Sequence, residues 1–487
     1  MTTYAEFLAR KALVAPATGI PSPPALSPKL KEHQRLLTTW ALRRGRAAIF
    51  ADTGLGKGWM ILEWARVVAE HTGKPVLILA PLAVSQQFER EAEKLWQTHN
   101  GRSGYESAIS IASTITVVSH QAQVVREVDA WTGVYVTNYH KLYKFDPSAF
   151  GGVALDEASI LKSLDGKTRK LLIESFRSTP FRLAATATPS PNDHTELGGQ
   201  AEFLGIMTQA EMLATFFVHD GGSTQDWRLK GHAREAFWRW VTSWGAIVKM
   251  PSDIGCSDDG YKLPELRYHE HIIPASREDA VKAGLLFAQP AETMQEQRAA
   301  RRGSLENRCT KAADIANDLP GDKQAIVWCE LNDESQYLTR QIGGAVEVTG
   351  SMTDDEKETA IAKFIAGERR VLVSKPSICG WGLNLQQVST VVFCGVTHSF
   401  EQFYQAVRRC WRFGQRRPVD VHIVSSELEG RVVENLKDKQ RKADELADET
   451  RHYVAGHVRE AVTSLGRQTI EYVATETVKW PEWLRSE

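Results

Sequence analysis

Short apolar runs alternate with segments of helical periodicity along most of the chain. In the first half, the runs typical of buried strands are residues 47–50, 76–80, 115–118, 134–137, 153–155 and 182–185. The segments Trp59–His71 and Val84–Lys94 between them carry apolar residues at helical spacing. This pattern predicts an α/β fold, in which helices cover both faces of a parallel sheet. Ligands of such folds bind at the carboxyl ends of the strands.

A second alternating series predicts another α/β unit over residues 261–426. Its strand candidates are residues 325–329, 346–349, 371–374, 390–394 and 419–424. The loop Asp253–Gly260 is the predicted boundary with the first unit, which covers residues 30–260. We expect an N-terminal extension over residues 1–29, which is rich in proline, and a charged helical C-terminal tail over residues 427–487.

Between about residues 200 and 250 the pattern becomes helical. Phe237, Val241, Trp244 and Val248 fall on one face of a predicted helix. We interpret this segment as a helical insert of the first unit whose tryptophans pack in a core. The alternative is that one of the tryptophans stacks on a nucleic-acid base.

Composition and charge narrow the class of protein. The 487 residues are 42% hydrophobic and 24% charged, which is typical of globular proteins of more than one domain. The net charge of −1 excludes a global basic field, so any nucleic acid must bind to local patches. The six cysteines form no CxxC pair, so we expect reduced thiols and no zinc site. No apolar run is long enough to span a membrane, and we expect a cytoplasmic protein.

Two segments of the first unit carry chemistry. In Ile49–Lys57 (IFADTGLGK), a strand ends in a glycine-rich loop, and Lys57 lies where a helix should begin. Such loops bind polyphosphate through backbone N–H groups, a helix N-terminus and the lysine. In Val153–Glu157 (VALDE), a second strand ends in adjacent carboxylates. Asp156 is therefore a candidate ligand of a magnesium ion bound to the nucleotide.

Further motifs follow in order: KEHQ at 31–34, TNY at 137–139, DEAS at 156–159, TATP at 186–189, GWGLNL at 380–385 and QAVRRCWRFGQ at 405–415. With these motifs, residues 30–426 resemble the superfamily 2 helicases and translocases. Within them, the chain is most similar to the Swi/Snf-like branch and to its compact forms in bacteriophages and prophages. The resemblance implies two RecA-like lobes that bind ATP and Mg²⁺ in the cleft between them.

The resemblance also implies roles for individual residues. Asp156 should hold Mg²⁺, Glu157 should act as the general base, and Arg409 and Arg412 should be arginine fingers that reach the γ-phosphate. The expected ATP-binding residues are Gln34, which would read adenine, and Thr53, Gly54, Gly56 and Lys57. Residues expected to couple hydrolysis to lobe movement are Thr186, Thr188, Gly382, Asn384 and Gln405.

Fewer residues are candidates for contact with nucleic acid than for the ATP site. Asn138 lies in the TNY motif, and Arg301 and Arg302 lie with Arg298 on a helical stretch. Other local basic groups are Arg43, Arg44 and Arg46, and Arg408, Arg416 and Arg417. Each group could bind the phosphate backbone or be ordinary surface.

The chain departs from the family pattern in two places. Gly58 follows Lys57 where the family has a serine or threonine that binds magnesium. We therefore expect weakened metal binding, which Gly58→Thr should restore, with Thr53 as the nearest other hydroxyl. The WNP triplet that often precedes the family's QAxxRxxRxGQ motif, here residues 405–415, is replaced by His398-Ser399-Phe400.

The predicted function is an ATPase that couples hydrolysis to lobe closure and to translocation along nucleic acid, with duplex DNA as the expected partner. A strand-separating helicase of DNA or RNA is one alternative. A nucleotide-regulated binding protein that hydrolyses ATP poorly is another, because of Gly58. A phage- or prophage-encoded chain would act in the bacterial host cytoplasm, and its C-terminal tail is a candidate site for protein partners.

Overall fold

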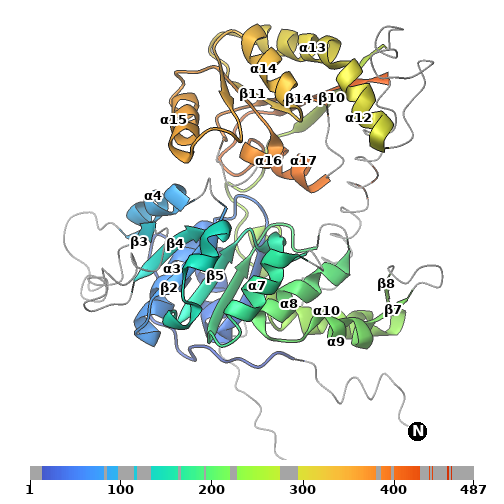
Figure 1. Ribbon diagram of the computed structural model, residues 1–487. Coiled ribbons are helices and arrows are strands. Elements are labelled where there is room, and N and C mark those ends of the chain that lie inside the picture. The colour runs from blue at the N-terminus through green and yellow to red at the C-terminus, as the bar shows by residue number, and fades with distance from the viewer. Residues whose placement is uncertain are drawn as a thin grey trace, which may run out of the picture.

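The computed structural model describes residues 14–81, 85–96, 115–117, 133–162, 166–190, 193–219, 227–274, 294–379, 385–395 and 400–427, and single positions 438, 441, 458, 459 and 462. These residues form two α/β lobes, one above the other in Figure 1. Each lobe is built on a parallel sheet flanked by helices, as RecA-like lobes are. This confirms the predicted fold class.

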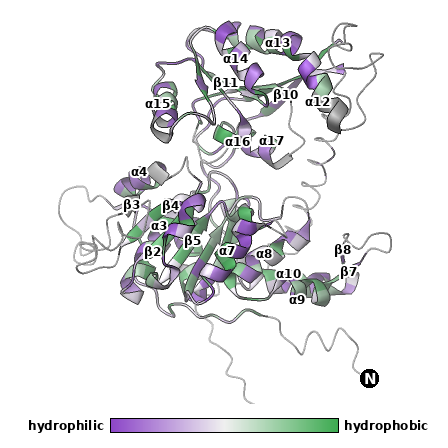
Figure 2. Ribbon diagram, viewed as in Figure 1, coloured by the Kyte–Doolittle hydropathy of each residue, from purple (hydrophilic) through white to green (hydrophobic). Residues whose placement is uncertain are grey.

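The first lobe contains a seven-stranded sheet in the order β3-β4-β2-β5-β6-β1-β9. Neighbouring strands are parallel throughout. The strands are β1 (Arg46–Ala51), β2 (Val76–Ala80), β3 (Ile115–Val117), β4 (Val134–Asn138), β5 (Gly152–Asp156), β6 (Phe181–Ala185) and β9 (Gly245–Val248). All of them except β9 were predicted, because buried parallel strands are continuous apolar runs. Figure 2 shows labelled strands such as β5 as mainly hydrophobic and helix α4 (Ser85–Trp96) as mainly hydrophilic.

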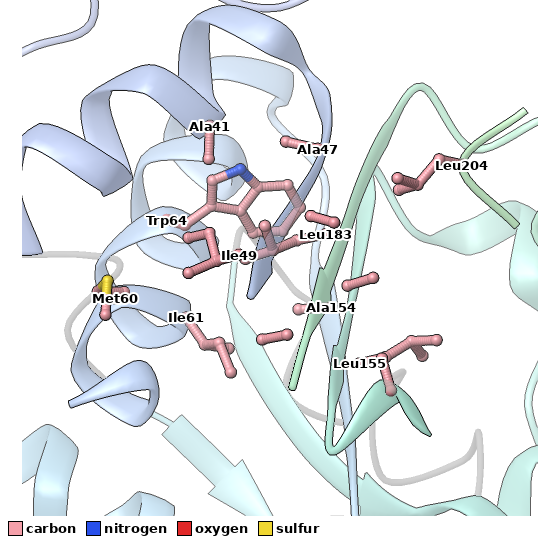
Figure 3. Packing of buried hydrophobic residues seen from close by; sticks show 14 of the residues in the cluster. Ala41, Ala47, Ile49, Met60, Ile61, Trp64, Ala154, Leu155, Leu183 and Leu204 are labelled. Carbon is pink, nitrogen blue, oxygen red and sulfur yellow. The ribbon is translucent and has the colours of Figure 1, made fainter. Parts of the chain in front are cut away.

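Helix α3 (Lys57–Thr72) packs against the sheet and carries the phosphate loop at its start. Figure 3 shows Trp64 of α3 among apolar side chains that include Ile49 of β1 and Leu183 of β6. The other helices of this lobe are α2 (Glu32–Arg44), α7 (Lys167–Ser175), α8 (Leu197–Leu204), α9 (Gln209–Phe216) and α10 (Arg234–Thr242). This packing fixes the loop after β1 relative to the end of β5.

The predicted helical insert is only partly helical. Helix α10 ends at Thr242, and Val248 belongs to β9, which pairs with β1 at the edge of the sheet. Two further short strands, β7 (Phe217–His219) and β8 (Trp227–Leu229), pair with each other. The prediction of one helical face through Val248 was therefore wrong. A short apolar run such as AIV fits a helix or a strand equally well, and its contact with β1 decides in favour of the strand.

The second lobe contains a six-stranded parallel sheet in the order β10-β15-β14-β11-β13-β12. The strands are β10 (Leu266–Ile273), β11 (Ala325–Cys329), β12 (Ala345–Val348), β13 (Val371–Ser374), β14 (Thr390–Cys394) and β15 (Val419–Ser426). The helices are α12 (Met294–Gly303), α13 (Leu305–Asn317), α14 (Asn332–Gln341), α15 (Asp354–Ile365), α16 (Pro376–Cys379) and α17 (Phe400–Val407). Sequence reasoning missed β10, an edge strand rich in polar residues.

Segments outside the two sheets pack on the first lobe. The backbone N–H of Ile20 donates to the carbonyl of Leu42 at 2.9 Å, and the Ile20 side chain is buried in the core. Val458 and Val462 of the C-terminal tail are buried in the same core. Most of the predicted tail, and the predicted coupling residues Gly382 and Asn384, lie outside the described residues. Within the described residues, no helix is both long and apolar enough to cross a membrane.

Candidate nucleotide site between the lobes

The loop between β1 and α3 has the conformation that its sequence predicts. Gly54 has φ of 94° and Gly56 has φ of 83°, a left-handed backbone that favours glycine. Helix α3 begins at Lys57, whose Nζ donates to the carbonyl oxygens of Ala51 at 2.8 Å and Asp52 at 3.4 Å. Burial lowers the pKa of Lys57, and the carboxylates of Glu157 and Asp156 oppose that effect. The ammonium group is thus held at the mouth of the loop, where a polyanion would meet it.

Gln34 lies directly against this loop. Its Nε2 donates to the carbonyl of Leu55 at 3.1 Å, and its Oε1 accepts from the backbone N–H of Lys31 at 2.9 Å. A Cβ added at Gly56 would lie 2.1 Å from Gln34 Nε2, so the loop needs glycine there for a second reason. An amide has two donor hydrogens and two acceptor lone pairs, so one of each is left for a ligand. Adenine recognition by Gln34 stays a prediction.

The adjacent carboxylates stand at the end of β5, beside the loop. Burial, followed by the charge of Glu157, raises the pKa of Asp156 to about 7, and the charge of Glu91 adds to this. Glu157 is the one residue other than glycine with positive φ, 54°, among the described residues. Its Oε2 is buried and has no hydrogen-bond partner within the described part of the chain. A strained, buried and partly unsatisfied carboxylate is typical of a functional site.

The second lobe supplies two arginines to the same place. Arg409 Nη2 lies 3.8 Å from Glu157 Oε1, across the gap between the lobes. Gln405 positions this arginine, because its Oε1 accepts from Arg409 Nη2 at 2.8 Å and its carbonyl accepts from Nε at 3.2 Å. Burial, followed by the charge of Arg409, lowers the pKa of Arg412 to about 10.

These groups line one cleft of about 420 Å³. Its walls include the predicted residues Gln34, Thr53, Gly54, Gly56, Lys57, Asp156, Glu157, Arg409 and Arg412. The structure therefore brings together all the residues predicted to bind ATP, hold its metal and catalyse its hydrolysis. The lobes touch here, since a Cβ added at Gly54 would lie 2.8 Å from the Cβ of Phe413.

Among the described residues, five further predicted residues do not line the cleft: Thr186, Thr188, Asn138, Arg301 and Arg302. Thr186 is buried, and its Oγ1 accepts from the backbone N–H of Thr188 at 3.2 Å in the loop after β6. Asn138 is buried at the end of β4, so contact with nucleic acid would require its exposure. Arg302 is exposed on α12 and Arg301 is half-buried. Their roles in coupling and nucleic-acid binding stay predictions.

The sequence allowed Arg408 to belong to a basic surface patch, but the structure does not place it in one. It is buried, and its Nη2 lies 2.5 Å from Asp52 Oδ2 in the first lobe. Its guanidinium lies 5.0 Å from the centre of the Trp411 ring. In the run RRCWR, Arg408 and Arg409 are adjacent and point to different partners. Sequence spacing alone did not separate an interlobe contact from a surface charge.

Sequence reasoning also missed an aromatic wall and a third carboxylate in the cleft. Tyr261, from the connection between the lobes, stacks on Phe413 with ring centres 4.6 Å apart. Lys31 Nζ lies 4.5 Å from the centre of each ring. Glu91 of α4 reaches the cleft beside Gly58. No sequence motif identifies aromatic residues at the edge of a cleft, and no sequence pattern marks Glu91 as a ligand.

The donor set of the cleft fits magnesium. Asp156 and Glu91 supply the carboxylate oxygens that Mg²⁺ prefers, and Glu157 carries a buried oxygen that no described residue hydrogen-bonds. Within the described residues, no group of three or more His, Cys, Asp or Glu could hold a metal by itself. This agrees with Mg²⁺ chemistry, because the ion is usually held by one or two carboxylates together with substrate phosphates.

Comparisons with known proteins agree with the site. Residues 311–414 match the helicase conserved C-terminal domain. The chain is 24% identical over 463 residues to protein p41 of Acyrthosiphon pisum secondary endosymbiont phage 1, which covers 85% of this chain and 97% of that protein. It is 22% identical over 464 residues to the probable global transactivator of Orgyia pseudotsugata multicapsid polyhedrosis virus, which covers 85% of this chain and 90% of that protein.

A shorter match points to the same class. Eukaryotic initiation factor 4A of Dictyostelium discoideum is 31% identical over 107 residues, which is 21% of this chain and 26% of that protein. Together with the two RecA-like lobes and the cleft, these matches support a superfamily 2 helicase. Such a protein is an ATP-hydrolysing enzyme that acts with nucleic acid.

Proposed function

We propose that this protein hydrolyses ATP in the cleft and uses the resulting lobe movement to translocate along duplex DNA. The observation that carries the proposal is the 3.8 Å approach of Arg409 Nη2 in the second lobe to Glu157 Oε1 in the first. Hydrolysis at such a site depends on lobe closure, because the general base and the arginine come from different lobes. ATP binding would then close the lobes and release of the products would open them, which would change the grip on nucleic acid.

Each residue has a role that its position supports. Lys57 and the backbone N–H groups of Thr53, Gly54 and Gly56 would bind the phosphates. Glu157 would take a proton from the attacking water, and Arg409 and Arg412 would stabilise negative charge on the γ-phosphoryl oxygens. Magnesium, held with the nucleotide by Asp156, would neutralise charge on the phosphates.

Duplex DNA is the proposed track because the motifs favour the Swi/Snf-like branch. The chain is also similar, over 90% of that protein's length, to a viral protein named as a probable global transactivator. The similarity to a phage protein over 97% of its length supports a phage-type member acting in a host cytoplasm. Contacts to phosphates rather than to bases would let a motor move without regard to sequence.

The decisive experiment is an ATPase assay without nucleic acid, with single strands and with duplex DNA, combined with displacement of a triplex strand. A translocase should hydrolyse ATP fastest on duplex DNA and displace the triplex strand without opening the duplex. Unwinding of a forked duplex would favour the strand-separating helicase. Nucleotide binding with negligible turnover under all conditions would favour a nucleotide-regulated binding protein.

A further inference from the structure

Gly58 lies beside a carboxylate. A Cβ added at Gly58 would be 2.4 Å from Oε2 of Glu91 and 3.4 Å from its Cδ. The carboxylate of Glu91 therefore occupies the place next to Lys57 where a larger residue at position 58 would put its side chain. Glycine at position 58 is what allows Glu91 to approach the phosphate loop so closely.

Glu91 is held in this orientation by its own helix. Gln87, one turn earlier on α4, donates from Nε2 to Glu91 Oε1 at 2.6 Å, while Oε2 faces Gly58. The helix is anchored by Phe88 and Trp96, which are buried in the core of the first lobe. Trp96 Nε1 also donates to Glu63 Oε2 at 3.2 Å on α3. The carboxylate is thus positioned by one hydrogen bond and a packed helix, as metal-binding carboxylates commonly are.

We propose that Glu91 is a magnesium-positioning residue of this chain, and that it replaces the hydroxyl that is missing at Gly58. The inference rests on the proposed ATP site and adds a residue to it. Glu91, Gly58 and Asp156 line the same cleft, so two carboxylates face the place where the phosphates would lie. This arrangement matches the preference of Mg²⁺ for one or two carboxylates together with substrate phosphates.

If Glu91 had a purely electrostatic role, its removal would change nucleotide affinity in the opposite direction. Glu91 is also close enough to Arg412 for their charges to interact. If Glu91 acted only as a negative charge in the cleft, its removal would strengthen binding of a polyanionic nucleotide with or without metal. If Glu91 positions the metal, its removal should weaken binding in Mg²⁺ and should not weaken it in EDTA.

The test measures the affinity of the full chain for a fluorescent, non-hydrolysable ATP analogue in EDTA and over a Mg²⁺ titration. Glu91→Ala should reduce the Mg²⁺-dependent gain in affinity by about 10–100-fold, the usual loss when support for a metal site is removed. Alanine is the best helix former, so α4 should stay folded. Glu93→Ala is the matched control, because Glu93 is exposed on the same helix.

A rescue experiment separates metal positioning from packing. Contrary to the expectation from the sequence alone, Gly58→Thr by itself should gain nothing, because its Cβ would displace the Glu91 carboxylate. Gly58→Thr combined with Glu91→Ala has room for the hydroxyl and should recover most of the lost Mg²⁺ dependence. The same Mg²⁺ dependence in Glu91→Ala and in the wild type overturns the inference but leaves the ATP site intact. A wild-type chain that binds no analogue in either condition overturns the proposed function and the inference with it.

Discussion

Arg408 of the second lobe and Asp52 of the phosphate loop form an ion pair between the two lobes, with Nη2 2.5 Å from Oδ2. The side chain of Arg408 is 4% exposed and that of Asp52 is 25% exposed, so water screens the pair only partly. Arg408 Nη2 also lies 3.4 Å from the carbonyl oxygen of Thr53. The phosphate loop is therefore in contact with both Arg408 and Phe413 of the same motif, which links loop conformation to lobe closure.

Asp52→Asn should favour open arrangements of the lobes, because it leaves Arg408 buried without its carboxylate. Breaking a buried pair by removing one partner costs about 3–5 kcal/mol, and the partial exposure of Asp52 places this pair toward the lower end. Interlobe distances from energy transfer between dyes should lengthen, and turnover should fall. Glu265→Gln is the control, since it breaks an exposed ion pair with Arg267 that is worth about 1 kcal/mol or less. Equal interlobe distances in Asp52→Asn and the wild type would contradict this role.

Glu157→Gln should bind ATP and fail to hydrolyse it, because an amide cannot take a proton from water. Lys57→Ala should instead lose nucleotide binding, since Lys57 is the cation at the mouth of the loop. Equilibrium binding of ATP and steady-state phosphate release distinguish the two variants. Hydrolysis by Glu157→Gln at the wild-type rate would show that another group is the base.

Arg409→Ala and Arg412→Ala should each cut turnover by about a thousandfold or more, the scale known for arginine fingers. ATP affinity should stay within about tenfold, because these residues act mainly when charge develops on the γ-phosphoryl group. Gln405→Ala should lower turnover by less, since it only positions Arg409. Single-turnover kinetics measure the chemical step directly. Unchanged turnover in Arg412→Ala would remove Arg412 from the catalytic group.

Most of the fold was predictable because the buried parallel strands are continuous apolar runs. Strand β2, whose five residues VLILA are all buried, is the clearest case. The strands that were missed in the two large sheets, β9 and β10, lie at the sheet edges, where this signal weakens. In β10, polar residues such as His269 and Glu270 interrupt the apolar pattern, and in β9 a run of three apolar residues follows Gly245. Only the contact with a neighbouring strand identifies these segments.

The site was predictable where a motif fixes the backbone and not where two lobes meet. Gly54, Gly56 and Lys57 carry their geometry in the local sequence. The partnership of Arg408 with Asp52 joins residues 356 positions apart. No local pattern encodes such a pair, because closing two folded lobes brings it together. Glu91 was missed for a different reason, because its helix meets the phosphate loop only through folding within the first lobe.

Stability of the second lobe should fall as the pH drops from about 6.5 toward 4, because of His422. Burial, followed by the charges of His269 and His271, lowers the pKa of His422 from its ordinary value of 6.5 to about 4, and Lys311 adds to this while Asp420 opposes it. The unfolded chain takes up a proton in this range that the folded chain does not, so the free energy of unfolding decreases with falling pH.

His422→Gln should flatten this pH dependence by up to one proton, as measured by urea unfolding between pH 7 and pH 5. The exposed His140, changed to Gln, serves as the control for the loss of a histidine elsewhere in the chain. The same slope in His422→Gln and the wild type would show that His422 titrates alike in the folded and unfolded chains.

Binding of duplex DNA should weaken steeply with salt, because neutralising phosphates releases counterions. Arg302 is exposed on α12, so Arg302→Ala should reduce the slope of log affinity against log salt by about one. Adding Arg301→Ala should reduce it by at most about one more. Arg301 is half-buried, and its backbone carbonyl accepts from Arg308 Nη2 at 2.6 Å, which limits its reach toward DNA.

Arg177, exposed near the amino-terminal end of β6 and thus opposite the nucleotide edge of the first sheet, is the control. A slope unchanged by Arg302→Ala, or changed equally by Arg177→Ala, would place the DNA groove away from α12. Affinity should also be the same for duplexes of different sequence, because these arginines would contact phosphates and not bases.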